Sequence, residues 1–223
     1  MSTVLLFDLD GTLVNTGGAG RRAMTAAYHE LFGRDDGFRF EFDGMTDFAI
    51  ARAGLRKQHG EDAAIDQAAI DEFLDKYLGY LEVELPRSEQ YRVLPGVSAL
   101  IESLANLPDV AVGLGTGNIK RGAYAKLVRG ALHDAFAFGG FGCDAEERTE
   151  LIRAGARRGA ERLGRPLEEC RVIVIGDTPK DIAAAKGIGA ACLAVATGGF
   201  TKAELAEHAP AHVAGTLAED GIR

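Results

Sequence analysis

The chain has 223 residues, of which 47% are hydrophobic and 26% are charged, proportions typical of a folded globular protein and not of a disordered one. Its formal net charge of -8 at pH 7 argues against a broad surface for nucleic acids or anionic membranes, because like charges repel. The sequence has no apolar run long enough to span a bilayer and no charged segment before its short apolar N-terminal stretch. We therefore expect neither a membrane span nor a signal peptide, and a cytoplasmic location.

Short runs rich in Val, Leu, Ile or Phe recur along the chain. Each is too uniformly apolar to leave one face in water, so we expect buried strands of a parallel sheet. The runs are Val4–Phe7, Val110–Leu114, Phe136–Phe138, Val172–Ile175 and Ala191–Val195. Most are separated by helical patterns, at Gly96–Ala105, Ile119–Arg129, Thr149–Leu163 and Pro179–Lys186. This alternation predicts an α/β fold, a doubly wound parallel sheet with right-handed crossovers.

One long insertion interrupts the alternation. About a hundred residues lie between the first and second predicted strands, far more than a crossover needs. Within them, Arg21–Leu31, Thr46–Gln58 and Ile65–Leu85 are rich in helix formers at helical spacing. We therefore expect residues 16–90 to form a helical subdomain inserted into an α/β core of residues 1–15 and 91–223.

Polar residues stand where three of the predicted strands end. Asp8 follows the first strand, Thr116 ends the second and Asp177 follows the fourth. The carboxyl ends of parallel strands share one edge of the sheet, where ligands bind, so these side chains should converge. Asp181, four residues after Asp177 and at the start of a helix, can face the same pocket.

The residue types at this edge indicate phosphoryl chemistry. Asp8, Asp10, Asp177 and Asp181 form a set of hard oxygen ligands, without nearby His or Cys, which suits Mg²⁺. Backbone N–H groups of residues 116–118 lead into a predicted helix, whose N-terminus can bind a phosphate or carboxylate. A metal, an anion cradle and a carboxylate able to form an aspartyl phosphate make up a phosphoryl-transfer site.

The motifs DLDGT (Asp8–Thr12), TGN (Thr116–Asn118) and GDTPKD (Gly176–Asp181), in this order, resemble the haloacid dehalogenase-like hydrolases. The resemblance covers essentially the whole chain and implies a Rossmann-like core, with the helical insert as a mobile cap. It also implies that Asp8 is the nucleophile, Asp10 the general acid and base, and Thr116, with Gly117 and Asn118, part of the phosphate site. Asp177 and Asp181 would complete a magnesium site with Asp8 and the Asp10 carbonyl.

Asp10 distinguishes between branches of this family. Dehalogenases lack an acid at this place, whereas phosphatases and phosphomutases use one to protonate the departing alcohol, a role typically worth ~10² to 10⁴ in rate. The sequence is most similar to the phosphoglycolate phosphatase branch, so we expect a small phosphorylated metabolite as substrate. The alternatives are a phosphomutase, a dehalogenase and a non-catalytic phosphate or metabolite sensor on the same fold.

The sequence departs from the family pattern at one position. Relatives usually carry a lysine before the helix that follows strand three, but no lysine occurs between Lys126 and Lys180. Arg148 is our expected substitute, because its guanidinium can bind phosphate through two donors. Lys126 is the alternative, although its place in the middle of a predicted helix favours a surface role.

Two further segments could contact the substrate. In FDGMTD (Phe42–Asp47), Gly44 and Thr46 belong either to a loop that reaches the active site, as in capped relatives, or to an ordinary turn and helix cap. Arg21 and Arg22 follow the glycine-rich Gly17–Gly20 segment and either meet an anionic substrate tail or are simply exposed; of the two, Arg22 is our candidate substrate-binding residue. The sequence carries no prediction of oligomeric state.

Overall fold

A parallel sheet forms the centre of the larger part of the molecule in the computed structural model, which describes residues 2–219 and 221. Within these residues, six strands pair in the order β5-β4-β1-β6-β7-β8, and every neighbouring pair is parallel. The strands are β1 (Thr3–Phe7), β4 (Val110–Thr116), β5 (Gly139–Phe141), β6 (Arg171–Gly176), β7 (Ala191–Val195) and β8 (His212–Ala214). This is the predicted α/β architecture with β1 in the interior of the sheet.

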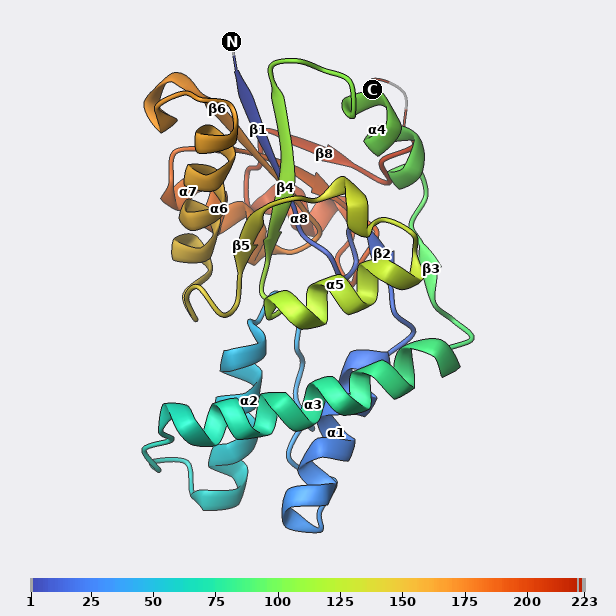
Figure 1. Cartoon of the computed structure of the whole chain (residues 1–223), viewed down its shortest axis with the longest axis vertical. Helices are drawn as coiled ribbons and strands as arrows, with labels where there is room; N and C mark the ends of the chain where they lie inside the picture. Colours follow the sequence, from blue (N-terminus) through green and yellow to red (C-terminus); the bar gives the residue numbers. More distant parts are fainter. Residues whose placement is uncertain (1, 220, 222–223) are drawn as a thin grey trace.

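Helices cover both faces of the sheet, as Figure 1 shows. One face packs on α4 (Val97–Leu104) and α5 (Lys120–Arg129). The other packs on α6 (Arg148–Arg162), α7 (Pro179–Gly187) and α8 (Lys202–Glu207). Successive side chains of a strand point to opposite faces, and β1 accordingly sends Leu5 and Phe7 into one core and Val4 and Leu6 into the other. This two-sided burial explains why the strands are apolar at almost every position.

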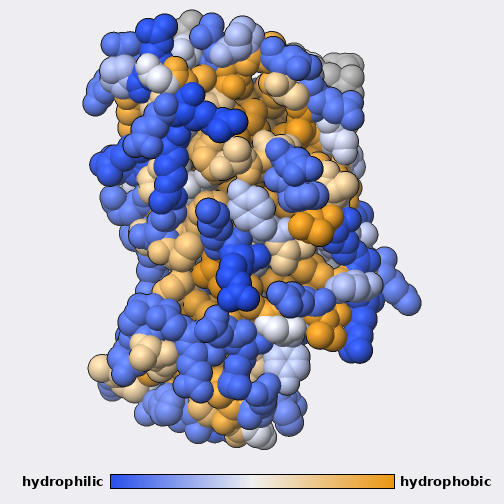
Figure 2. Space-filling view, viewed as in Figure 1, coloured by the Kyte–Doolittle hydropathy of each residue, from blue (hydrophilic) through white to orange (hydrophobic). Residues whose placement is uncertain are grey.

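Helices α1 (Ala19–Phe32), α2 (Asp47–His59) and α3 (Gln67–Arg87) make up the second part of the molecule. They lie between β2 (Val14–Asn15) and β3 (Arg92–Val93), which pair antiparallel where the chain leaves and re-enters the core. Their apolar faces form a separate hydrophobic core around Tyr28, Phe73 and Tyr77. Figure 2 shows apolar side chains on this face both over the upper, sheet-containing part and around the middle, where the helical part meets it.

The third predicted strand is displaced along the chain. Phe136–Phe138 precede the strand, and β5 is formed by Gly139, Gly140 and Phe141. Glycine has a low strand propensity, but a side chain at Gly140 would overlap the Leu151 carbonyl oxygen of α6. The glycine pair thus lets α6 lie directly against the strand. The pattern of apolar residues in the sequence does not indicate this packing requirement. Strand β8 and helix α8 were not predicted at all.

Among the described residues, none of the helices combines the length and the apolar character needed to cross a bilayer.

Candidate active site

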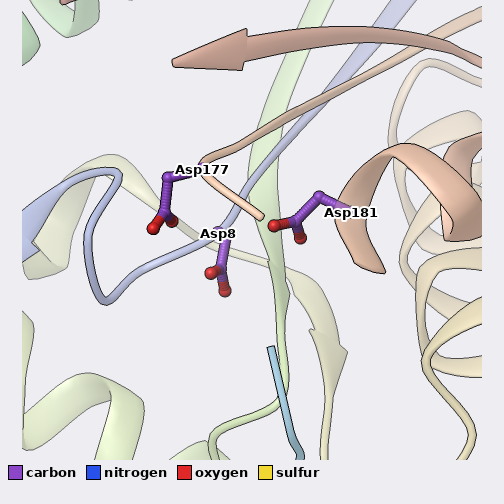
Figure 3. A group of neighbouring side chains, drawn as sticks. All are labelled: Asp8, Asp177 and Asp181. Atoms are coloured by element: carbon purple, nitrogen blue, oxygen red, sulfur yellow. The ribbon is translucent and has the colours of Figure 1, made fainter. Parts of the chain in front are cut away.

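Asp8, Thr116 and Asp177 lie side by side because their strands are neighbours. Asp8 follows β1, Thr116 closes β4 and Asp177 follows β6, and β1 pairs with both of the other strands. Figure 3 shows the carboxyl groups of Asp8, Asp177 and Asp181 around one space. Each of them offers an oxygen atom within 4.8 Å of the others, and all three are buried. The structure therefore brings together residues that are far apart in the sequence.

Local helix signals fix the position of Asp181. Thr178 is the N-cap of α7 and Pro179 is its first residue, a favourable start for a helix. Asp181 completes the capping box: its Oδ2 accepts hydrogen bonds from the Thr178 backbone N–H (3.0 Å) and hydroxyl (2.7 Å). Its Oδ1 accepts from Arg148 Nη2 at 2.6 Å. Both oxygens are thus engaged, so Asp181 contributes negative charge and holds Arg148.

Arg148, the first residue of α6, is buried beside the two aspartates. Its Nη2 lies 3.0 Å from Asp8 Oδ1 and 2.6 Å from Asp181 Oδ1. Its Nη1 donates to the carbonyl oxygen of Gly44, in the segment between α1 and α2, at 3.3 Å. The guanidinium therefore occupies the place beside Asp8 where we expected a substitute for the family lysine, and it also touches the helical part of the molecule.

The buried acids carry more negative charge than Arg148 balances. Burial and the neighbouring carboxylates raise the pKa of Asp8 to about 6, although Arg148 acts in the opposite direction. Burial, Asp8 and Asp181 raise the pKa of Asp177 well above its usual range. Three carboxylates and one guanidinium leave an excess of two negative charges when all are ionised. Hard oxygen donors with this excess charge fit a divalent cation such as Mg²⁺.

Asp10 is held by a second group of residues on the opposite side of Asp8. Lys126 Nζ donates to Asp10 Oδ2 (2.6 Å) and to Asn118 Oδ1 (2.6 Å), and Asn118 Nδ2 donates to the same Asp10 oxygen (2.8 Å). Asn118 Nδ2 also donates to Thr116 Oγ1 at 3.0 Å. The expected surface role of Lys126 is therefore wrong: the residue is 4% exposed, because it lies on the inner face of α5.

A cavity of about 220 Å³ lies between the sheet edge and the helical part. Its core side includes Asp8, Asp10, Thr116, Gly117, Asn118, Lys126 and Arg148. Its other side is formed by residues of the helical part, among them Arg21, Met24, Phe42, Gly44, Asp47 and Tyr77. The candidate catalytic residues thus face a partly open cavity whose outer wall is the inserted helical segment.

The loop before α2 lies directly against the phosphate-site loop of the core. The Asp47 backbone N–H donates to the Gly117 carbonyl oxygen, and the Ile119 N–H donates to Asp47 Oδ2, both at 2.8 Å. A side chain at Gly117 would come within 2.5 Å of the Met45 carbonyl oxygen, so only glycine allows this approach. Burial raises the pKa of Asp47 to about 6, although Lys126 and the Ile119 N–H lower it.

Thr46 and Arg22 do not line this cavity, which corrects part of our expectation. Thr46 Oγ1 caps α2 by accepting from the Ala49 N–H at 3.2 Å, and it faces a neighbouring hollow. Arg22 donates to Glu84 Oε2 (2.6 Å) and to the Gly17 carbonyl oxygen (2.7 Å) on a separate part of the surface. On a helix, adjacent residues point in different directions, and it is Arg21 that lines the cavity.

Arg21 and Asp47 also line the cavity. Arg21 was considered beside Arg22 as a contact of the substrate tail, whereas Asp47 was not singled out as a site residue. Arg21 lies 3.9 Å from the centre of the Phe42 ring and donates to the carbonyl oxygens of Phe38 and Phe40. For Lys126 a signal was present in the sequence, since it lies three and four residues after Ala123 and Gly122 on the apolar stripe of its helix. For Asp47 we find no comparable signal, because its place depends on a contact between distant segments.

Residues 3–189 match the model of a family described as haloacid dehalogenase-like hydrolases. The chain belongs to this family. The match spans β1 to α7. It therefore includes every residue of the buried acidic cluster and the two buried basic residues, Lys126 and Arg148. A comparison with curated protein sequences gives no significant match.

Solved structures of this fold resemble the chain over nearly its full length. CbbY from Rhodobacter sphaeroides in complex with phosphate superposes with a TM-score of 0.73 at 22% identity, covering 99% of this chain and 97% of CbbY. A predicted phosphoglycolate phosphatase from Haemophilus somnus 129pt gives 0.70 at 18% identity, covering 98% and 95%. A mutant CbbY in complex with xylulose-1,5-bisphosphate gives 0.72 at 19% identity, covering 99% and 97%. These similarities establish the Rossmann-like fold of this hydrolase.

Proposed function

We propose that this hydrolase cleaves a small phosphomonoester in the presence of Mg²⁺, through a phosphoryl group carried on Asp8. The observation that carries the proposal is the placement of Asp8. Its carboxylate lies at the end of an interior strand, 3.0 Å from the Arg148 guanidinium, and faces a cavity that Asp10 and Thr116 also line. A fixed nucleophile with a cation beside it and an acid within the same cavity suits phosphoryl transfer to a carboxylate.

In the first step, a carboxylate oxygen of Asp8 attacks phosphorus as the bond from phosphorus to the ester oxygen breaks. Asp10 gives its proton to the departing oxygen, so the alcohol leaves neutral. The Thr116 hydroxyl and the Arg148 guanidinium donate to the phosphoryl oxygens and stabilise the charge that develops on them. The products of this step are the free alcohol and an aspartyl phosphate.

In the second step, the Asp10 carboxylate accepts a proton from water, and the water oxygen attacks phosphorus. The bond between phosphorus and Asp8 breaks, inorganic phosphate leaves, and Asp8 and Asp10 regain their initial states. The same residue thus acts first as acid and then as base. A dehalogenase would require no such acid, so the presence of Asp10 beside the nucleophile favours a phosphate ester.

Asp8 and Asp177, with the Asp10 backbone carbonyl, are the groups we propose as Mg²⁺ ligands, and Asp181 adds its charge. A bound divalent cation would neutralise charge on the phosphoryl oxygens. The excess negative charge of the buried acids supports this assignment. The glycines beside Asp177 support it as well, because side chains at Gly11 or Gly198 would overlap the Asp177 carboxylate.

The size of the cavity supports a small substrate. Its volume of about 220 Å³ is below the ~300–1,000 Å³ common for drug-sized ligands. A phosphorylated metabolite of a few carbon atoms, such as phosphoglycolate, fits this size better than a nucleotide. We propose that the helical part, residues 16–90, acts as a cap that closes over this substrate and excludes bulk water.

The test is a panel of small phosphate esters incubated with the protein and Mg²⁺, with free phosphate as the readout. We expect phosphate release for at least one ester and loss of release in Asp8→Asn, which should keep its fold. Formation of an isomeric phosphate without free phosphate would indicate a phosphomutase. Binding without turnover across the panel would support the non-catalytic alternative and contradict the proposed function.

A further inference from the structure

Lys126 is an unusual residue for the inner face of a helix. Its side chain is 5% exposed, and its ammonium group lies 2.6 Å from both Asp10 Oδ2 and Asn118 Oδ1. Lysine is rarely buried unless it is paired, because removing its charge from water is costly. An apolar residue at this place would continue the stripe of Gly122, Ala123 and Leu127, and replacing a buried ion pair by apolar groups is often neutral or stabilising. Packing alone therefore does not account for Lys126.

The hydrogen bonds around Asp10 are unequally distributed over its two oxygens. Within residues 2–219 and 221, both Lys126 and Asn118 donate to Oδ2, which leaves Oδ1 for the cavity. The Asp10 side chain is 42% exposed, so without these donors it would be free to change rotamer. Two donors on one oxygen fix the direction of the other.

We propose that Lys126 is a positioning residue for Asp10: together with Asn118 it holds one carboxylate oxygen so that the other faces the leaving group of the substrate. This inference rests on the proposed role of Asp10 as general acid and base. A proton donor must lie within hydrogen-bond distance of the departing oxygen, and a displaced donor loses most of its effect.

The same network extends to the phosphate side of the site. Asn118 Nδ2 donates to both Asp10 Oδ2 and Thr116 Oγ1, so Lys126 orients an amide that contacts two candidate site residues. Arg148, by contrast, binds Asp8 and Asp181. The two basic residues thus have separate partners: Arg148 contacts Asp8, the proposed nucleophile, and Lys126 contacts Asp10, the proposed acid.

The test uses aryl phosphates of similar shape whose leaving groups differ in basicity, from p-nitrophenyl phosphate to phenyl phosphate. The readout is kcat/KM, which covers only the steps up to the departure of the alcohol. Lys126→Met should reduce kcat/KM at least 10-fold more for phenyl phosphate than for p-nitrophenyl phosphate, because the more basic oxygen depends more on a proton donor. Lys126→Gln, a second variant should the first not fold, is expected to show the same selective loss.

The matched control is Lys120→Met, on the exposed N-terminal turn of the same helix, which should behave like the unmodified protein with every leaving group. An equal loss for all leaving groups in a folded Lys126 variant would mean a merely structural role and would overturn the inference, as would unchanged kinetics. If the unmodified protein releases no phosphate from any ester, the proposed function itself fails and the inference with it. If it does release phosphate and the variants show no selective loss, the inference alone fails.

Discussion

Arg148 contacts Asp8, the proposed nucleophile, through its guanidinium, where we expected a substitute for a lysine. Its Nε and Nη2 both donate to Asp181 Oδ1, and Nη2 also reaches Asp8. A lysine supplies one compact charge, whereas arginine supplies several donors in a plane, so the two are not equivalent at such a site. The arginine allows one side chain to hold Asp181 and face Asp8 at once.

We predict graded effects for replacements of Arg148. Arg148→Lys keeps the charge and should reduce kcat moderately, by about 10-fold. Arg148→Met removes the charge beside Asp8, and we expect kcat to fall by about 10²- to 10³-fold, the range found when an oxyanion-stabilising donor is removed. Steady-state kinetics with the best ester of the panel, combined with thermal unfolding to verify folding, measure both. A Met variant as active as the Lys variant would rule out a role for the charge.

Asp47 gives a prediction on stability and pH. Its pKa is raised to about 6, chiefly by burial, so the folded protein binds this proton more tightly than the unfolded chain does. The carboxyl therefore destabilises the fold progressively as the pH rises from about 4 to about 6, and the full cost is present above that range.

Asp47→Asn removes this cost while keeping an oxygen that can accept from the Ile119 N–H. We expect the free energy of unfolding to increase by about 1–3 kcal/mol at pH 8 and to change little at pH 4. Urea denaturation of both proteins at the two pH values measures this difference. Equal destabilisation at both pH values would mean that the hydrogen bond matters more than the buried charge.

Among the elements, β5 and α6 depend on glycine for their close packing. A side chain at Gly140 would overlap the Leu151 carbonyl oxygen, whereas one at Gly79, on the exposed side of α3, would meet nothing within 4 Å. Gly140→Ala should therefore lower the free energy of unfolding by about 1–3 kcal/mol. Gly79→Ala should raise it by about 0.5–1 kcal/mol, because alanine is the better helix former. Equal effects in denaturant titrations of the two variants would contradict this packing.

Some elements of the fold could be predicted from the sequence and others could not. Uniformly apolar strands such as β1 and β6 were predictable because both of their faces are buried, and residues at their carboxyl ends had to meet once the strands were parallel. The position of β5 could not be predicted, because its close packing against α6 requires glycine in place of residues that favour strands. Arg22 was chosen over Arg21 because charge alone does not indicate which side of a helix faces the cavity. The place of Asp47 depends on a contact with Ile119, 72 residues away in the chain.

On the scale of the whole molecule, several contacts join the helical part to the core around the cavity. Asp47 exchanges hydrogen bonds with the loop after β4, and Arg52 Nη2 pairs with Glu146 Oε2 at 2.9 Å just before α6. Gly44 accepts a hydrogen bond from Arg148. The outer wall of the cavity is thus held by the same core segments that carry the candidate catalytic residues. On this account, the proposed closure of the helical part over a substrate also completes the site.

The most direct test of the account is to trap the protein during turnover and locate the phosphoryl group. The protein is mixed with Mg²⁺ and the best phosphate ester, quenched in acid within milliseconds, digested, and analysed by mass spectrometry. The account predicts a phosphoryl group on Asp8, present during turnover and missing in Asp8→Asn. A phosphoryl group on another residue, or undiminished phosphate release by Asp8→Asn, would contradict it.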